Sequence, residues 1–125
     1  MINFQNSNVF KLKATDNNTF ANILSQIIVN GEQVIGSFKT VRDGVVFTNK
    51  RVIAINVQGV TGKKIDVTSL PYSKLSAYSC ETAGFFDADS ELELWFAGLG
   101  KVRFEFSGKT NISEINRAIS VFTLN

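Results

Sequence analysis

The chain contains no histidine, and it has one cysteine and one proline among its 125 residues. Histidine is the usual general base for serine, cysteine and threonine nucleophiles, so its absence argues against enzymes of that kind. The single cysteine, Cys80, excludes an internal disulfide. It stands in the strand-like run SAYSCETA without a basic neighbour, so a structural thiol is the expected role. These absences predict a protein that is not an enzyme and that holds no cofactor or metal.

The first residues, MINFQNSNVF, contain neither a basic leader nor a long apolar stretch. A signal peptide needs both features, and a membrane-spanning helix needs a much longer apolar segment. Because the chain also carries an unpaired thiol, we expect it to reside in the cytoplasm.

Thirteen basic and eleven acidic residues leave a net charge of +2, and no run of basic residues is longer than two. Nucleic-acid binding requires a basic stripe, so no nucleic-acid partner is predicted. Hydrophobic residues make up 44% of the chain and include eleven phenylalanines, which is typical of one packed domain. We therefore expect a single domain over residues 1–125.

Two segments show the period of a helix. In residues 18–29 the apolar side chains follow a spacing of three and four, and Asn30 and Gly31 supply a stop signal. In the last segment Ile112, Ile115, Ile119 and Phe122 share one stripe after a capping pattern of Asn111 and Glu114. The sequence thus predicts an N-terminal amphipathic helix, within a helical extension over about residues 1–30, and a C-terminal helix.

The chain between these helices has short apolar runs broken by turn residues, which is typical of an antiparallel sandwich or barrel. The breaks delimit seven expected strands, at residues 33–42, 45–47, 51–57, 64–69, 75–82, 92–96 and 102–106. The class is mainly β: seven strands and a closing helix, over about residues 31–125, follow the order of the pleckstrin-homology (PH) superfold. The clearest alternation is in the last two strands, where Leu92, Leu94, Phe96, Val102, Phe104 and Phe106 are expected in the core.

Several separate pieces of the sequence resemble the bacterial PH domain family, formerly a domain of unknown function. They are RD at 42–43, FTNKR at 47–51, GVTGKK at 59–64, PY at 71–72 and ETAG at 81–84 followed by FD at 86–87. The resemblance implies a PH-like fold and ring-forming homo-oligomers. It implies no activity, substrate or cofactor, so no catalytic residues are carried over.

Four basic residues are weak candidates for binding an anion. Lys39 and Arg42 flank a turn, and Lys63 and Lys64 end a glycine-turned hairpin that lacks the spacing of a phosphate-binding loop. We expect Asp43-Gly44 to form a two-residue hairpin turn. Such a turn is too short to surround an inositol headgroup, and the Asp43 carboxylate would repel phosphate. No specific phosphoinositide binding is therefore predicted, and a membrane partner is not expected.

Three residues are candidates for a subunit interface. The segment 51–57 is apolar on both faces, so Val52 and Ala54 are either buried beneath the N-terminal helix or in contact with another copy. Trp95 is placed on the polar face of its strand by its neighbours, and aromatic residues are enriched at protein contacts. The strand expected at 33–42 has little charge before Lys39, and we expect it to be an exposed sheet edge.

These observations predict a PH-like scaffold or adaptor that binds its own copies in a closed homo-oligomer, and a further, unidentified protein. A module that binds anionic lipid headgroups or phosphate is the alternative.

Overall fold

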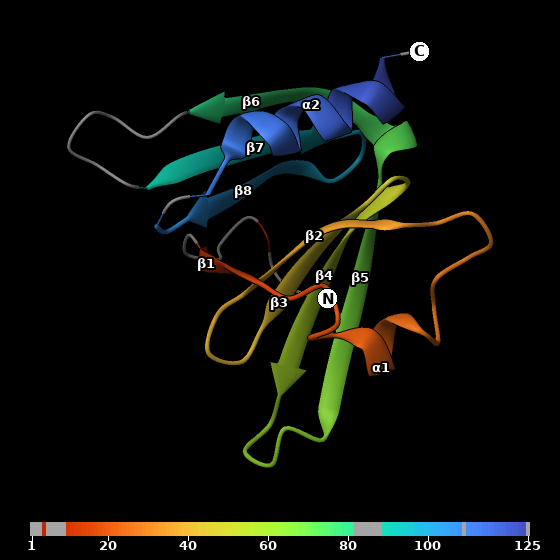
Figure 1. Ribbon diagram of the computed structural model, residues 1–125, viewed down its shortest axis with the longest axis vertical. Coiled ribbons are helices and arrows are strands. Elements are labelled where there is room, and N and C mark those ends of the chain that lie inside the picture. The colour runs from red at the N-terminus through yellow and green to blue at the C-terminus, as the bar shows by residue number, and fades with distance from the viewer. Residues whose placement is uncertain (1–3, 5–9, 82–88, 109, 125) are drawn as a thin grey trace.

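The computed structural model describes residue 4 and residues 10–81, 89–108 and 110–124, and it is mostly β with a C-terminal helix (Figure 1). Eight strands form one curved sheet in the order β5-β4-β3-β2-β1-β8-β7-β6. The strands are β1 Phe10–Thr15, β2 Val34–Lys39, β3 Gly44–Thr48, β4 Arg51–Gln58, β5 Lys64–Pro71, β6 Leu75–Glu81, β7 Ser90–Phe96 and β8 Gly100–Phe106. The sheet folds over so that β2 to β5 face β6 to β8 across the core, which confirms the expected PH-like class.

The seven expected strands are present as β2 to β8. In β7 and β8 the predicted alternation is confirmed. Leu92, Leu94, Val102 and Phe104 are buried, while the residues between them reach the surface. Alternation specifies a half-buried strand because successive side chains point to opposite faces. The part of the β6 expectation at residue 82, and the resembling pieces at 82–84 and 86–87, lie outside the described residues.

Strand β1 was missing from the sequence-based prediction, and it joins the two halves of the sheet. Its first half runs parallel to β8, with Phe10 opposite Phe104, and its second half runs antiparallel to β2, with Lys13 opposite Lys39. Leu12, at the crossing point, is fully buried in the core. The signal was the alternation of FKLKAT, which marks a strand without naming its partners.

The main core lies between the two halves and is rich in aromatic rings. Phe38 meets Phe47 and Phe106 edge to face at centroid distances of 5.8 and 4.9 Å, and Phe47 meets Phe104 in the same way at 6.2 Å. Such pairs add about 0.5–1.5 kcal/mol each to the burial of the rings.

The N-terminal helix is much shorter than predicted. Only α1, Ala21–Leu24, is α-helical, and the expected range of 18–29 is wrong. Asp16 holds the chain in a turn, because its carboxylate accepts the Asn18 N–H at 2.7 Å and its carbonyl accepts the Thr19 N–H at 3.0 Å. The apolar residues still pack as their pattern predicts, on the outer face of the sheet against Val46, Ile53 and Ile55; they are Phe20, Ile23, Leu24, Ile27 and Ile28.

The C-terminal helix α2, Ile112–Thr123, is confirmed, and it packs over β6 and β7 (Figure 1). The Asn111 side chain accepts the Glu114 N–H at 3.3 Å, as the capping pattern predicts. Ile112, Ile115 and Ile119 are buried in the main core.

The connection between β2 and β3 differs from the expected two-residue turn. Lys39 pairs with Gly44, so four residues, 40–43, form the loop. The Thr40 N–H donates to the Asp43 carbonyl at 2.9 Å, and the Asp43 N–H donates to the Thr40 hydroxyl at 3.0 Å. Gly44 therefore belongs to the strand, and the prediction of a two-residue turn is wrong.

Candidate functional site

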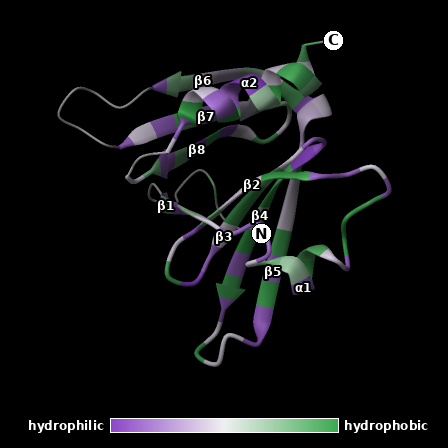
Figure 2. Ribbon diagram, in the orientation of Figure 1, coloured by the Kyte–Doolittle hydropathy of each residue, from purple (hydrophilic) through white to green (hydrophobic). Residues whose placement is uncertain are grey.

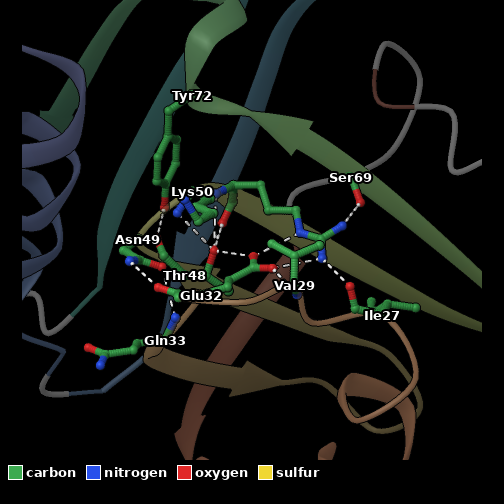
Figure 3. Close-up of polar contacts among 11 residues, drawn as sticks. Ile27, Val29, Glu32, Gln33, Thr48, Asn49, Lys50, Ser69 and Tyr72 are labelled. Carbon is green, nitrogen blue, oxygen red and sulfur yellow. Dashed lines mark hydrogen bonds and ion pairs between the residues drawn. The ribbon is translucent and has the colours of Figure 1, made fainter.

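A buried carboxylate lies at the centre of a polar network (Figure 3). The Glu32 side chain is fully buried, and Arg51 donates to both of its oxygens, from Nε to Oε2 and from Nη2 to Oε1, each at 2.9 Å. The Thr48 hydroxyl donates to Oε2 at 2.7 Å and the Val29 N–H to Oε1 at 3.2 Å. The negative charge is thus matched by a bidentate guanidinium and two neutral donors.

Two opposing effects act on the Glu32 carboxyl. Burial raises its pKa, but the hydrogen bonds from Arg51, Thr48 and Val29 together with the Arg51 charge outweigh that effect, so the pKa of Glu32 lies below its ordinary value. The group is therefore ionised at neutral pH and already satisfied by its partners. A catalytic acid or base needs a pKa near the working pH, so Glu32 is placed for a structural role.

The resembling piece at 47–51 supplies most of this network. The Asn49 side chain accepts the Gln33 N–H at 2.8 Å and donates to the Gly31 carbonyl at 3.0 Å. Arg51 also donates to the Ile27 carbonyl at 2.7 Å. These bonds attach the segment after α1 to the turn between β3 and β4. The motif therefore holds the fold together, a role that the sequence-based reading did not identify.

Tyr72 extends the network towards α2. It lies in the short 3-10 helix η1, Tyr72–Lys74, and its hydroxyl donates to the Thr48 carbonyl at 2.8 Å. Burial, and the negative charge of Glu32, raise the pKa of the Tyr72 hydroxyl, so it remains a hydrogen-bond donor. A hollow of about 550 Å³ lies beside it, lined by Asn49, Lys50, Tyr72, Ser73, Leu75, Phe122 and Thr123.

The four basic candidates lie at the opposite end of the molecule from α2. Arg42 Nη2 donates to the Gly59 carbonyl, which brings the β2–β3 loop against the β4–β5 loop. Lys63 and Lys64 follow in that second loop and at the start of β5, and all four side chains are exposed, Lys39 included. The fold therefore places Arg42 beside the loop that leads to the two lysines.

The Asp43 carboxylate is held by hydrogen bonds to β4. One carboxylate oxygen accepts the Val57 N–H at 3.0 Å and the Asn56 amide at 3.1 Å. The carboxylate therefore fixes the loop to β4. Of the two sequence-based reasons against an anionic partner at this end, the structure corrects the two-residue turn, whereas the Asp43 carboxylate remains in the loop.

The interface candidates separate into two cases. Val52 and Ala54 are fully buried in the main core, while Ile53 and Ile55 on the other face of β4 are covered by the segment around α1. Both faces of β4 are therefore buried within one chain, which explains why its residues are apolar on both faces. Neither Val52 nor Ala54 is available to a second subunit. Trp95 is half-buried on the outer face of β7, where its orientation is as predicted.

The free sheet edges are not where they were expected. Strand β2 pairs with both β1 and β3, so the prediction that it forms an edge is wrong. Among the described residues, β5 pairs with β4 alone and β6 pairs with β7 alone. The second neighbour of β2 is β1, a strand that the sequence-based prediction lacked. Local sequence pattern does not show which strands pair, so it did not show where the sheet edges lie.

The chemistry available elsewhere is limited. A second hollow, of about 390 Å³, lies between β6 and α2, where the Asn116 amide contacts the Cys80 sulfur at 3.3 Å. Across the described part of the chain, no three acidic or cysteine side chains gather in a way that would hold a metal ion. No helix in that part is long and apolar enough to cross a bilayer.

Comparisons with known proteins agree with this architecture. The family model described as bacterial PH domain matches residues 3–123. The uncharacterized protein YjqA of Bacillus subtilis (strain 168) is 44% identical over 99 residues, which cover 78% of this chain and 79% of YjqA.

Two crystal structures from Shewanella have the same fold. One is a DUF1696 family protein with a pleckstrin-homology domain from Shewanella loihica PV-4, with a TM-score of 0.77, 37% identity and coverage of 90% of this chain and 97% of that one. The other is a pleckstrin homology domain from Shewanella amazonensis SB2B, with a TM-score of 0.66, 39% identity and coverage of 89% and 90%. None of these names assigns a reaction or a partner. With its sandwich, its closing helix and its matching sequence, the chain belongs to the bacterial PH domain family.

Proposed function

We propose that this protein is a non-catalytic, cytoplasmic scaffold that binds its own copies through the free edges of its sheet. The observation that carries the proposal is strand β6, an edge that pairs with one described neighbour and contains a single charged residue, Glu81, at its end. Ser76, Ala77 and Ser79 are exposed along it. Monomeric proteins usually protect such an edge with lysine, proline or a covering element.

The opposite edge has a different character. Strand β5 carries Lys64 and Asp66, ends on Pro71, and exposes Ile65 at 45% of its full surface. A contact between β6 of one copy and β5 of the next joins two different surfaces. Such a heterologous contact closes into a ring or grows into a fibre, and a ring is the form compatible with a stable protein. A closed ring of this kind uses both edges of every copy, so a further protein partner would bind another surface of the scaffold.

The absence of histidine from the whole chain supports the non-catalytic part of the proposal. The buried Glu32 and the half-buried Arg51 support it further, because their hydrogen-bonding groups are used within the fold.

Light scattering coupled to gel filtration at micromolar concentration tests the assembly. We expect the wild type to elute at a multiple of 13.8 kDa, and the variant Ser79→Lys to shift towards the monomer. Residue 79 lies opposite Glu93, so a lysine there is compatible with the folded monomer and acts at the edge. Gln26→Lys, an exposed change beside α1, is the matched control and should keep the wild-type mass.

A wild-type mass of 13.8 kDa would refute self-assembly. A two-fold dimer would retain association and remove the ring. An assembly that Ser79→Lys and Gln26→Lys leave equally intact would show that β6 is not the contact.

A further inference from the structure

The hollow of about 550 Å³ beside Tyr72, which we call the Tyr72 hollow, lies where three elements meet. Lys50 comes from the turn between β3 and β4, Ser73 from η1 and Thr123 from the last turn of α2. Figure 1 shows the end of α2 beside η1, and Figure 3 shows Lys50 near the Tyr72 side chain. Pockets of roughly 300–1,000 Å³ hold small ligands, so this hollow has the size of a binding site.

Hydrogen bonds within the chain fix the walls of the Tyr72 hollow. The Tyr72 N–H donates to the Lys50 carbonyl at 3.1 Å, and the Tyr72 hydroxyl donates to the Thr48 carbonyl at 2.8 Å. The hydroxyls of Tyr78 and Ser120 share a hydrogen bond of 2.6 Å, which attaches α2 to β6. The hollow is therefore formed without a ligand, which lowers the ordering cost of binding one.

Lys50 supplies the charge of this hollow. It is the one charged side chain among the described residues that line the hollow, and it forms no ion pair with a described carboxylate. Its ammonium group is a point charge with three hydrogen-bond donors. A single cation matches a ligand with one negative charge, such as a carboxylate, better than a phosphate group, which carries roughly two charges at pH 7.

A hydroxyl group gives an independent indication of a ligand. The Thr123 hydroxyl oxygen is buried and has no hydrogen-bond partner among the described residues. Buried polar groups in folded proteins are nearly always hydrogen-bonded, so an unpaired one requires an explanation. Thr123 lines the hollow together with the exposed Ser73, and a hydroxyl is a donor that a carboxylate oxygen accepts. A bound carboxylate would supply the partner that the Thr123 hydroxyl lacks.

Apolar side chains adjoin these polar groups. Leu75 and Phe122 also line the hollow, and Phe122 keeps 40% of its surface exposed. Val121 and Leu124 beside it are 59% and 70% exposed, and Figure 2 shows the hydrophobic character continuing to the end of α2. A ligand that covers Phe122 removes apolar surface from water, so an apolar group on the ligand adds to its affinity.

We propose that the Tyr72 hollow binds a carboxylate that carries an apolar group, with the carboxylate on Lys50 and the two hydroxyls and the apolar group against Phe122. Two kinds of molecule supply this chemistry, namely a free small acid and the C-terminus of a peptide that ends on an apolar residue. All residues of the site belong to one chain, so binding does not require the proposed self-assembly.

Saturation-transfer NMR, which detects weak ligands on a protein of any assembly size, tests the proposal. We expect N-acetylleucine to bind the full chain with a dissociation constant of roughly 1 mM, as its small size allows. N-acetylleucine amide has the same shape without the charge, and acetate has the charge without the apolar group. Both should bind at least about tenfold more weakly than N-acetylleucine.

Three variants test the three contacts separately. Lys50→Gln should weaken N-acetylleucine about tenfold or more, because it removes the cation. Phe122→Ala should weaken N-acetylleucine about threefold to tenfold and leave acetate unchanged. Thr123→Val should weaken N-acetylleucine without lowering the free energy of unfolding, because the hydroxyl has no described partner in the folded chain.

Lys74→Gln is the matched control for Lys50→Gln. Lys74 is an exposed lysine of η1 that is not among the residues lining the hollow, so this variant should bind as the wild type does. Urea titration of every variant verifies that it folds. A Lys50→Gln affinity equal to that of Lys74→Gln would show nonspecific charge attraction and overturn the proposal.

Two further probes distinguish the sources of the carboxylate. They are a short acetylated peptide that ends on leucine with a free carboxylate, and the same peptide as its C-terminal amide. Tighter binding of the peptide acid than of N-acetylleucine would assign the site to a peptide C-terminus, and weaker binding would assign it to a free small acid; either result supports the carboxylate site. Equal binding of acids and amides, or no binding of any probe, would overturn the proposal and leave the self-assembly test unaffected.

Discussion

Gly44 lies directly beneath the ring of Phe20. A Cβ atom built on Gly44 would stand 2.2 Å from Phe20 Cζ, far inside van der Waals contact. Gly44 begins β3 and lies opposite Lys39 on one side and Ile55 on the other. Because Gly44 has no side chain, the Phe20 ring, just before α1, packs directly on its backbone. The residue that sequence reasoning assigned to a turn is instead a packing site.

Gly44→Ala is therefore expected to displace the Phe20 ring and to lower the free energy of unfolding by about 1–3 kcal/mol. In the double variant with Phe20→Ala the added methyl group meets no ring, so the two effects should be less than additive by about 0.5–3 kcal/mol. Urea titration of the four proteins measures this. Strictly additive effects would contradict the contact between Gly44 and Phe20. Because the φ angle of Gly44 is not in the left-handed region, alanine adds its methyl group there without backbone strain.

Arg51→Ala should be strongly destabilising, by about 3–5 kcal/mol, because it leaves the buried Glu32 carboxylate without its cation. Lys50→Ala is the control, since Lys50 is exposed and immediately adjacent in sequence, and its effect should stay within about 0.5 kcal/mol. Urea titration at pH 7 compares the two variants. If Arg51→Ala costs less than about 1 kcal/mol, the network does not hold the fold as described.

The same carboxylate should make stability depend on pH. Because the pKa of Glu32 is lower in the folded state than its ordinary value of 4.5, its contribution is present above that value and is lost as the pH falls through the folded pKa. The stability difference between the wild type and Glu32→Gln should therefore shrink below about pH 4.5. Denaturant titrations between pH 7 and pH 3 measure it.

Glu91→Gln serves as the comparison for this pH series. The hydrogen bond from Arg103 also lowers the pKa of Glu91, but both side chains are partly exposed and screened by water. We expect Glu91→Gln to follow the wild-type pH profile closely. A Glu32→Gln profile that runs parallel to the wild type down to pH 3 would contradict the assigned ionisation.

Phe104→Ala should cost about 3–5 kcal/mol, because Phe104 is fully buried and its ring meets Phe47. Arg103→Ala, at the next position on the outer face of β8, should cost no more than about 1 kcal/mol. Denaturant titration of both variants tests which face of β8 is inward. A loss below about 1 kcal/mol for Phe104→Ala would reverse the assignment.

Several features followed from the sequence because they depend on neighbours a few residues apart. The alternation in 91–96 and 102–106 identifies the buried faces of β7 and β8, since side chains on a strand alternate between two environments. The cap at Asn111 and the apolar stripe after it identify α2 for the same reason. The PH-like class itself rested on the number and order of such elements.

Other features were decided by contacts between distant parts of the chain. Residues 10–15 alternate, but nothing in them indicates that one half pairs with β8 and the other with β2, and that pairing moves the free edges to β5 and β6. The apolar residues after Asp16 have a helical spacing, yet the hydrogen bonds that Asp16 accepts and the contact of Phe20 with Gly44 favour turns around one short helix. The proximity of the β2–β3 loop to the β4–β5 loop arises in the same way, because Arg42 and Asp43 bond to residues on another hairpin. Local pattern specifies which side of an element is buried, whereas the partner that covers it is selected by packing across the whole fold.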